Sequence, residues 1–226
     1  MSGFEIRPIA HLESDLSEKF GIPRQAGLVE ALEGRIIFEP EFRSPDALRG
    51  IEGFSHLWLI WQFSAALRET WSPTVRPPRL GGNERVGVFA SRSPFRPNSL
   101  GLSCVRLLSV ERDEKLGPVL RVAGADLMDG TPIFDIKPYL PYADAKPEAL
   151  SGFAPDGGAT LALRYEPGTE EKIPPEKRAA LRGVLENDPR PRYQDDPQRL
   201  YGLSFAGRQV RFRVEDGTVV VTEVEE

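Results

Sequence analysis

The chain has 226 residues, and its 29 Lys and Arg residues against 34 Asp and Glu residues give a formal net charge of −5. This balance excludes a protein that binds anions through overall positive charge. A composition of 40% hydrophobic and 28% charged residues also excludes a fibrous or disordered chain.

The cysteine and histidine counts and the hydropathy of the chain exclude further classes of protein. One cysteine and two histidines exclude a disulfide framework and a cysteine-cluster metal site, so we expect no metal. The longest apolar stretch, at 57–63, is far shorter than the roughly 20 residues of a membrane span, and no apolar leader begins the chain. We therefore expect a soluble, cytoplasmic protein without a membrane partner.

Glycines and prolines, 21 of each, fall at short intervals between apolar runs, which is typical of short strands separated by turns. In 55–63 the residues alternate between two largely apolar faces, one with Leu57 and Leu59 and the other with Trp58 and Ile60. We expect this strand to be central in its sheet. The predicted strands in chain order are 35–39, 55–63, 86–91, 100–110, 118–127, 132–137 and 160–165.

Helical periodicity is scarce in the chain. Residues 45–49 and 65–70 allow one or two turns each, and 175–187 predicts a helix with an apolar stripe. A three-stranded meander is expected after it, at Leu203, 210–214 and 219–224, with Asp216 and Gly217 as the last hairpin turn.

These elements predict a mainly β protein. No strand is followed by Gly-x-Gly-x-x-Gly and no βα repeat is visible, which argues against a doubly wound nucleotide-binding fold and favours a β-barrel or sandwich. The chain becomes rich in small residues at 151–158 and acidic at 166–172. We place a domain boundary there, with one domain over 1–150 and a small α+β domain over 151–226.

Positive charge concentrates between residues 76 and 106, where six arginines accompany one acid and give a local net charge of +5. The planar guanidinium group suits bidentate binding of phosphate or carboxylate, so this cluster indicates an anionic ligand. The alternative is a solvated surface on which the arginines pair with acids. The six are Arg76, Arg79, Arg85, Arg92, Arg96 and Arg106.

Two of these arginines lie in the loop Arg-Ser-Pro-Phe-Arg-Pro-Asn-Ser at 92–99, between two predicted strands. Its prolines restrict the backbone, so the loop is stiff and holds its polar side chains outward. A stiff, charged loop on a β scaffold is typical of a binding site, although its arginines can instead cap carbonyl groups of a plain turn.

Two further segments place charged side chains in or beside predicted turns. Asp126, Asp129 and Asp135 are three carboxylates within ten residues, and Asp135 and Lys137 share one face of a predicted strand, where they can pair. Turn-forming aspartates are more often structural than catalytic. In Asp-Pro-Arg-Pro-Arg-Tyr at 188–193, arginines and an aromatic ring can hold phosphates and stack a base.

Six motifs occur in an order that is specific for one family. They are FGIPRQAGL at 20–28, GFSHLW at 53–58, TVRPPRLGGN at 74–83, VFASRSPFRPNSLGLS at 88–103, DLMDGTPIFDIKPYLPYAD at 126–144 and DPRPRY at 188–193. Over nearly its whole length the chain resembles the TrmO family, also called TsaA-like proteins, of tRNA adenine N6-methyltransferases.

The resemblance implies a β-barrel domain over 1–150 that binds S-adenosyl-L-methionine without a Rossmann fold. It also implies a homodimer with the cofactor near the subunit interface. The implied substrate is threonylcarbamoyladenosine at position 37 of threonine tRNA, which gains an N6-methyl group, and the C-terminal domain over 151–226 is then a tRNA contact.

The resemblance also assigns residues, motif by motif. The implied cofactor site contains Pro23, Arg24, Gln25, Phe63, Ser64, Arg92, Leu100, Asp126, Leu127, Met128 and Asp129. The catalytic candidates are Asn98, Asp126, Asp129, Asp135, Lys137 and Tyr139. The resemblance also makes Arg96 a neighbour of the transfer site and Arg190 an RNA contact. Together with residues of the two arginine-rich segments, the RNA-binding candidates are Arg76, Arg79, Arg96, Arg190, Arg192 and Tyr193.

One departure from the family pattern bears on the mechanism. Many relatives follow the equivalent of Phe63 with histidine, whereas this chain has Ser64, and a hydroxyl cannot replace imidazole as a base. The base therefore stays open among Asp126, Asp129 and Asp135. Two competing interpretations also stay open: a noncatalytic RNA- or adenosine-binding module, and a methyltransferase that acts on another RNA or on a small molecule.

Overall fold

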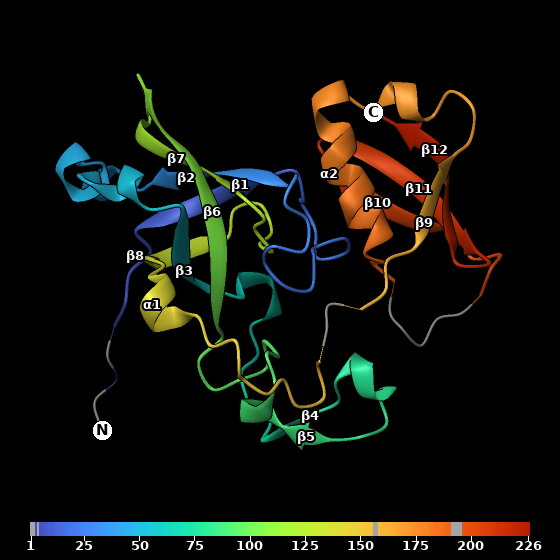
Figure 1. Ribbon diagram of the computed structural model, residues 1–226, viewed down its shortest axis with the longest axis horizontal. Helices are drawn as coiled ribbons and strands as arrows, with labels where there is room; N and C mark the ends of the chain where they lie inside the picture. The colour runs from blue at the N-terminus through green and yellow to red at the C-terminus, as the bar shows by residue number, and fades with distance from the viewer. Residues whose placement is uncertain (1–2, 4, 156–157, 191–195) are drawn as a thin grey trace.

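The computed structural model describes residues 3, 5–155, 158–190 and 196–226. Figure 1 shows a barrel, a separate four-stranded sheet with a helix, and a mostly irregular segment that projects away from both. Within the described residues, no helix has both the length and the apolar character needed to cross a bilayer.

Six antiparallel strands close into the barrel, in the order β1-β2-β7-β6-β3-β8, with β8 paired back to β1. This architecture confirms the predicted mainly β fold and its β-barrel. The strands are β1 (Ala10–Ser14), β2 (Glu33–Phe38), β3 (His56–Gln62), β6 (Leu100–Asp113), β7 (Gly117–Ala123) and β8 (Pro132–Pro138).

Alternation of side chains along β3 fills the barrel. Leu57, Leu59 and Trp61 are buried in the interior, whereas Trp58 and Ile60 are half-buried on the outer face. β3 pairs with β6 on one side and β8 on the other, as each strand of a closed barrel is paired on both sides, so it is not an edge strand, as its two apolar faces predict. The rest of the core comes from inward residues of the other strands, including Leu12, Ile36, Val105, Leu120, Val122 and Ile133.

The C-terminal part is a four-stranded sheet covered by a helix. Its order is β10-β11-β12-β9, and β9 lies parallel to β12. Asp216 and Gly217 both have positive φ, 46° and 73°, as a two-residue hairpin turn between β11 and β12 requires. The elements are β9 (Ala162–Tyr165), α2 (Pro175–Glu186), β10 (Tyr201–Phe205), β11 (Arg208–Glu215) and β12 (Thr218–Glu225).

The segment between β1 and β2 packs against this C-terminal sheet and helix rather than inside the barrel. Leu16, Val29 and Leu32 belong to the hydrophobic core that the apolar face of α2 and the strands β10–β12 form. Gly21 permits the contact, because a Cβ there would lie 2.2 Å from Leu203 Cδ1. The polypeptide thus joins its two parts through a packed N-terminal segment as well as through the connection near residue 150.

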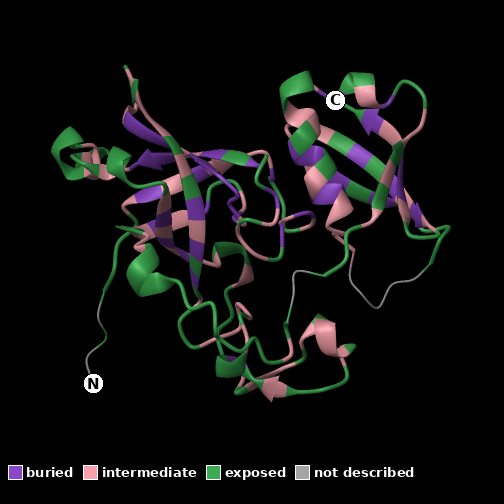
Figure 2. Ribbon diagram, viewed as in Figure 1, coloured by how far each residue is buried: buried purple, intermediate pink, exposed green. Residues whose placement is uncertain are grey.

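Residues 64–99, between β3 and β6, form an arm with little buried surface. It contains the short hairpin β4 (Thr74–Val75) and β5 (Val86–Gly87). In this arm, every residue of which the structure describes, Val88 is the one buried residue, so the arm is green and pink in Figure 2 apart from that point.

Some predicted elements differ from the structure. Residues 86–91 are a two-residue strand followed by a 3-10 turn, because Ser91 N bonds back to the Val88 carbonyl. β1 is too short for its alternation to be recognised, and the parallel pairing of β9 joins residues more than fifty positions apart. The remaining short elements are α1 (Pro141–Asp144) and 3-10 helices at Pro40–Phe42, Pro45–Leu48, Ile51–Gly53, Ser64–Ala66, Pro78–Leu80, Val88–Ala90 and Glu170–Lys172.

Candidate active site and nucleic-acid interface

Several predicted site residues lie on loops at one end of the barrel. Gln62 at the end of β3 pairs with Leu100 at the start of β6, and Ala123 at the end of β7 pairs with Glu33 at the start of β2. The loops that follow β3 and β7 and those that precede β2 and β6 therefore open at the same end. These loops carry four of the family motifs.

Asp126 is tied to the barrel core by two successive hydrogen bonds. Ser103 Oγ donates to Asp126 Oδ1 at 2.5 Å, and Trp61 Nε1 donates to Ser103 Oγ at 2.9 Å. Ser103 and Trp61 are inward-facing barrel residues that are only 2% and 5% exposed. The close-packed interior therefore fixes the position of this carboxylate.

Burial raises the pKa of the Asp126 carboxyl above its ordinary value. Hydrogen bonds from Ser103 and from the backbone amide of Ala26 oppose this rise, as does the positive charge of Arg92. Asp126 is therefore a better proton acceptor near neutral pH than an exposed aspartate.

Arg92 connects the stiff 92–99 loop to the segment before β2. Its Nη1 donates to Gln25 Oε1, and Gln25 Nε2 donates to the Arg24 carbonyl. Gln25, Arg92 and Asp126, which are far apart in the sequence, thus form one polar cluster at the barrel end.

An apolar group adjoins this cluster. The Phe63 ring packs on Trp61 at a centroid distance of 4.3 Å, and Phe63 N donates to the Ser99 carbonyl at 2.9 Å. The neighbouring Ser64 is exposed and begins a 3-10 turn, and Leu100 is 37% exposed at the start of β6. Hydrogen-bonding and apolar surface therefore meet at this end of the barrel.

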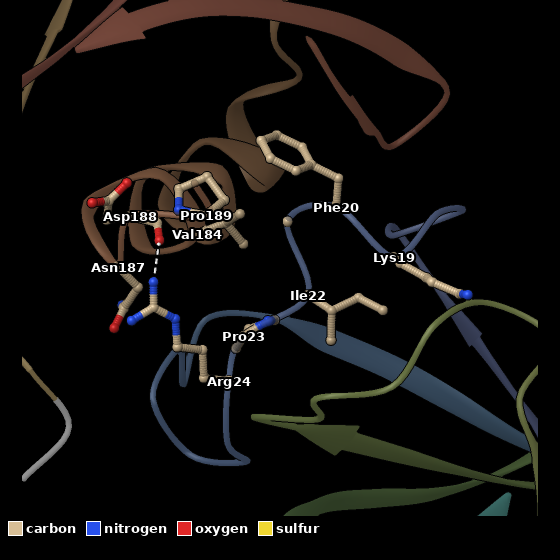
Figure 3. Close-up of a pocket in the computed structure, with 10 residues that line it drawn as sticks. Lys19, Phe20, Ile22, Pro23, Arg24, Val184, Asn187, Asp188 and Pro189 are labelled. Atoms are coloured by element: carbon tan, nitrogen blue, oxygen red, sulfur yellow. Dashed lines mark hydrogen bonds between the residues drawn. The ribbon is translucent and has the colours of Figure 1, made fainter. Parts of the chain in front are cut away.

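Arg24 reaches the C-terminal part of the chain. Its Nη2 donates to the Asp188 carbonyl at 3.0 Å, as Figure 3 shows, and to the Arg190 carbonyl at 3.4 Å. The Arg190 guanidinium in turn pairs with both carboxylate oxygens of Asp188, at 2.8 and 3.1 Å. The Asp188-Pro189-Arg190 turn is therefore held directly against the loop that carries Gln25.

A cavity of about 320 Å³ lies where these two loops meet. Apolar side chains of both parts line it, with Arg24 at one side (Figure 3). Its lining residues are Lys19, Phe20, Gly21, Ile22, Pro23, Arg24, Val184, Asn187, Asp188 and Pro189.

The rest of the 126–129 run has contacts away from the Gln25, Arg92 and Asp126 cluster. The Leu127 side chain is wholly buried in the barrel core, and the Met128 carbonyl accepts bonds from Thr131. Asp129 Oδ1 accepts the Ser14 amide at 2.9 Å, and Asp129 lines a separate charged cavity of about 490 Å³. Its contacts are those of a turn residue that joins the 126–130 loop to β1.

Asp135, Lys137 and Tyr139 lie on the outer side of the barrel. Asp135 pairs across the strands with Ile60, and its carboxylate lies 3.0 Å from Lys137 Nζ, which confirms the predicted pair. Tyr139 packs on Trp58 at 5.7 Å. The contacts of these three residues are separate from those of Asp126. Asn98, the other catalytic candidate, is exposed in the 92–99 loop, and its carbonyl accepts the Leu100 amide.

The predicted RNA-binding arginines differ in their surroundings. Arg76 is exposed and Arg79 half-buried on the arm, whereas Arg96 braces the 92–99 loop by donating to the Ser91 and Ser93 carbonyls. Arg190 is paired with Asp188 and its side chain is only 11% exposed. Arg192 and Tyr193 lie outside the described residues.

Sequence reasoning missed Ser103, which holds the Asp126 carboxylate. A signal for it existed, because Gly101, Ser103 and Val105 share the inward face of β6, and a hydroxyl among inward residues requires a hydrogen-bond partner. The identity of that partner could not be read from the sequence.

Comparison with known proteins identifies the family. The model for the tRNA-methyltransferase O N-terminal domain matches residues 11–145, and the model for the TrmO C-terminal domain matches residues 159–226. The chain belongs to the TrmO family. This result confirms the resemblance that the motifs predict.

Relatives of known name support the same assignment. A tRNA (adenine(37)-N6)-methyltransferase of Escherichia coli K12 is 41% identical over 234 residues, which cover 100% of this chain and 99% of that protein. A Pseudomonas aeruginosa protein, whose name provisionally assigns it to the S-adenosylmethionine-dependent methyltransferases, is 40% identical over 88% of this chain and 87% of its own. A crystal structure of TrmO superposes with a TM-score of 0.82 at 33% identity, with both chains covered completely.

TrmO motifs that are distant in the sequence of this chain lie close together in its structure. The motifs at 20–28, 88–103 and 126–144 supply Gln25, Arg92, Ser103 and Asp126 to one cluster. The motif at 188–193 contacts the first of them through Arg24. Residues that the linear order separates are brought to one end of the TrmO barrel.

Proposed function

We propose that this chain transfers the methyl group of S-adenosyl-L-methionine to N6 of adenosine 37 in tRNA, and that its substrate is threonylcarbamoyladenosine in threonine tRNAs. Membership of the TrmO family and the Escherichia coli relative, named as a tRNA (adenine(37)-N6)-methyltransferase, support the reaction. The resemblance of the motifs supports the narrower substrate. The proposal places the protein in the cytoplasm together with its tRNA.

The observation that carries the proposal is the cluster of Gln25, Arg92 and Asp126 beside Phe63 at the barrel end. The guanidinium, carboxylate and aromatic groups of this site suit S-adenosyl-L-methionine, which combines an amino acid, a sulfonium cation and an adenosine. A guanidinium binds a carboxylate, a carboxylate attracts a cation, and an apolar ring covers a purine. The same set suits adenosine with a threonyl carboxylate.

When bound, the cofactor supplies an activated methyl group with its own leaving group. The protein's task is then to position the reactants and manage one proton. The N6 nitrogen is a poor nucleophile, but its carbamoyl substituent makes the N6 proton more acidic. Among the three aspartates left open as bases, we propose that the Asp126 carboxylate accepts it, because of its fixed position and raised pKa.

Arg92 has the role of orienting a carboxylate, of either the cofactor or the threonyl group. Its hydrogen bond to Gln25 is to a neutral amide oxygen, and its positive charge also acts on the Asp126 carboxyl, so the guanidinium keeps a positive charge that can attract a bound anion. Replacement by alanine is expected to weaken binding of one of these two ligands. Unchanged binding of both, measured by calorimetry, would remove the assignment.

We also propose a homodimer that uses the outer face of β3 and β6. There Ile60 pairs with Leu102 and Trp58 with Cys104, and Leu102 is 58% exposed. An apolar strip of this kind is typical of an interface between copies. The substitution Leu102→Arg is expected to shift sedimentation toward the monomer, and unchanged sedimentation would place the interface elsewhere.

The test of function is transfer of labelled methyl from S-adenosyl-L-methionine to two matched threonine tRNAs, one with threonylcarbamoyl at position 37 and one without it. Label in the modified tRNA alone supports both reaction and substrate. Label in both keeps the reaction and removes the threonylcarbamoyl requirement. Label in neither, with cofactor still bound, favours a noncatalytic module or another substrate.

Matched variants connect this test to the site. Asp126→Asn is expected to bind tRNA normally but to transfer methyl slowly. Asp46→Asn is the control for general loss of a carboxylate, because Asp46 is exposed and pairs with Arg49 outside the proposed site. Full turnover by Asp126→Asn would show that this carboxylate is not the base.

A further inference from the structure

The arm carries an exposed aromatic pair. Trp71 and Phe89 are 50% and 74% exposed, and their rings stack at a centroid distance of 6.2 Å with an interplanar angle of 25°. Exposed aromatic side chains of this size seldom lie together on a protein surface without a binding partner. Neither ring is among the cofactor, catalytic or RNA-binding candidates named above.

The hairpin of the arm holds the two rings together. Thr74 pairs with Gly87 and Val75 with Val86, and Val88 N donates to the Pro73 carbonyl at 3.0 Å. Trp71 precedes and Phe89 follows this ladder, so both rings lie at its base. Buried Val88 anchors the same end. The two rings are therefore presented by a hydrogen-bonded ladder rather than by free loops.

The arm that carries the pair is positively charged. The arm has six arginines and two glutamates, so it carries +4 and leaves the remaining residues with −9. Several of these arginines contact neutral groups: Arg85 donates to Thr74 Oγ1, Arg96 donates to two carbonyls, and Arg68 stacks over Phe95. These contacts leave the positive charges uncompensated, so the arm favours a polyanion.

We propose that Trp71 and Phe89 form a stacking site for an unpaired base of an RNA, with neighbouring arginines on its phosphates. Aromatic faces bind any unstacked base, and arginines bind its backbone, which is the chemistry of single-stranded nucleic-acid sites. A contact between the arms of two copies is disfavoured here, because two arms of +4 repel one another. The proposal rests on the proposed function only in taking tRNA as the natural RNA.

The position of Phe89 connects this site to the candidate active site. Phe89 lies three residues before Arg92, and Ser91, between them, accepts the Arg96 guanidinium at its carbonyl. A base stacked on the pair would therefore be held near the loop that contacts Gln25. An unpaired loop base next to the methylated adenosine suits this arrangement better than a paired base in a helix.

The direct test compares two ten-nucleotide single-stranded RNAs of equal charge, one of adenosines and one with abasic riboses, together with an intact threonine tRNA. Wild-type protein is expected to prefer the oligomer with bases and to quench the indole emission of Trp71. The double variant Trp71→Ala, Phe89→Ala is expected to lose this preference and to bind tRNA roughly 5- to 150-fold more weakly, the effect of removing one stacked base.

Conservative and control variants separate stacking from folding. Trp71→Phe is expected to keep the preference for bases while the RNA-induced quenching disappears. Leu150→Ala, which truncates a 99% exposed side chain outside the arm, is expected to change nothing. In the double variant the slope of log affinity against log salt for the abasic oligomer should stay at the wild-type value, because phosphate contacts remain.

Three results would overturn the proposal: no preference for bases in the wild type, an unchanged preference in the double variant, or dissociation of a dimer by the double variant with RNA binding intact. A fourth result, loss of cofactor affinity alone, would also overturn it and assign the rings to the cofactor. Failure of the proposed function is separate, because a protein that methylates no tRNA can still prefer the base-containing oligomer.

Discussion

The barrel and the arm use the same kinds of residue for opposite purposes. In the barrel, Leu59 and Trp61 are buried and paired on both sides, whereas in the arm Trp71 and Phe89 are exposed and Val88 alone is buried among residues 64–99, all of them described. Stability therefore resides in the barrel, and the arm, which contributes little buried area, is available for binding.

The largest effect should come from truncating the barrel core. Leu59→Ala removes a fully buried side chain from β3 and is expected to lower the free energy of unfolding by about 2–5 kcal/mol. Leu67→Ala in the arm, where Leu67 is 57% exposed, is expected to change it by less than about 0.5 kcal/mol. Urea unfolding of both variants measures the two changes in unfolding free energy. Equal losses would contradict the difference between the barrel and the arm.

A smaller effect is expected where the barrel meets the site. A Cβ on Gly101 would lie 2.2 Å from the Trp61 ring, so Gly101→Ala should cost about 1–3 kcal/mol of unfolding free energy through overpacking. Gly53→Ala is the matched control, because no atom lies within 4 Å of the added Cβ. Since Trp61 holds Ser103, weaker cofactor binding by Gly101→Ala at a temperature where it is folded should accompany the loss.

Substitution of a charged residue in the arm should change the salt dependence of tRNA binding rather than the free energy of unfolding. Arg85→Ala is expected to leave unfolding unchanged and to reduce the slope of log tRNA affinity against log salt by about 1, the share of one phosphate contact. Arg49→Ala, whose guanidinium already pairs with Asp46, should keep the wild-type slope. Identical slopes for Arg85→Ala and the wild type would remove Arg85 from the RNA surface.

The smallest expected effect is the pH dependence of the contribution of Asp126 to the free energy of unfolding. Because its pKa in the folded protein is above the ordinary 3.8, the folded state holds the proton more tightly, and the contribution of Asp126 to stability falls as pH rises from about 3.8 through the folded pKa. The unfolding free energy of Asp126→Asn minus that of the wild type should therefore increase with pH through this window and then become constant.

Asp113 supplies the control of opposite sign. Backbone amides of Leu116 and Lys115 lower the pKa of its carboxyl, so its contribution to stability is present above pH 3.8 and is lost as pH falls through the folded pKa. Asp113→Asn should consequently lose its disadvantage in acid. Urea titrations between about pH 3 and about pH 8 measure both differences, and parallel curves for both variants would contradict the assigned directions.

The sequence by itself determined the local elements and the family. Alternation in β3, the apolar stripe of α2 and the Asp216-Gly217 turn specify structure through short-range periodicity and backbone preference, and each is found as predicted. Five of the six arginines predicted to cluster over 76–106 lie on the arm, whereas Arg106 lies on β6, and the order of six motifs identified the TrmO family.

Only the tertiary structure decided which of the candidate residues act together. Three aspartates of similar appearance differ because Asp126 contacts buried Ser103, Asp129 caps the Ser14 amide and Asp135 faces outward beside Lys137. The packing of residues 16–32 on the C-terminal core and the Arg24 contact with Asp188 join segments over 150 positions apart. Burial, strand register and long-range hydrogen bonds depend on the closed chain, so no local pattern encodes them separately.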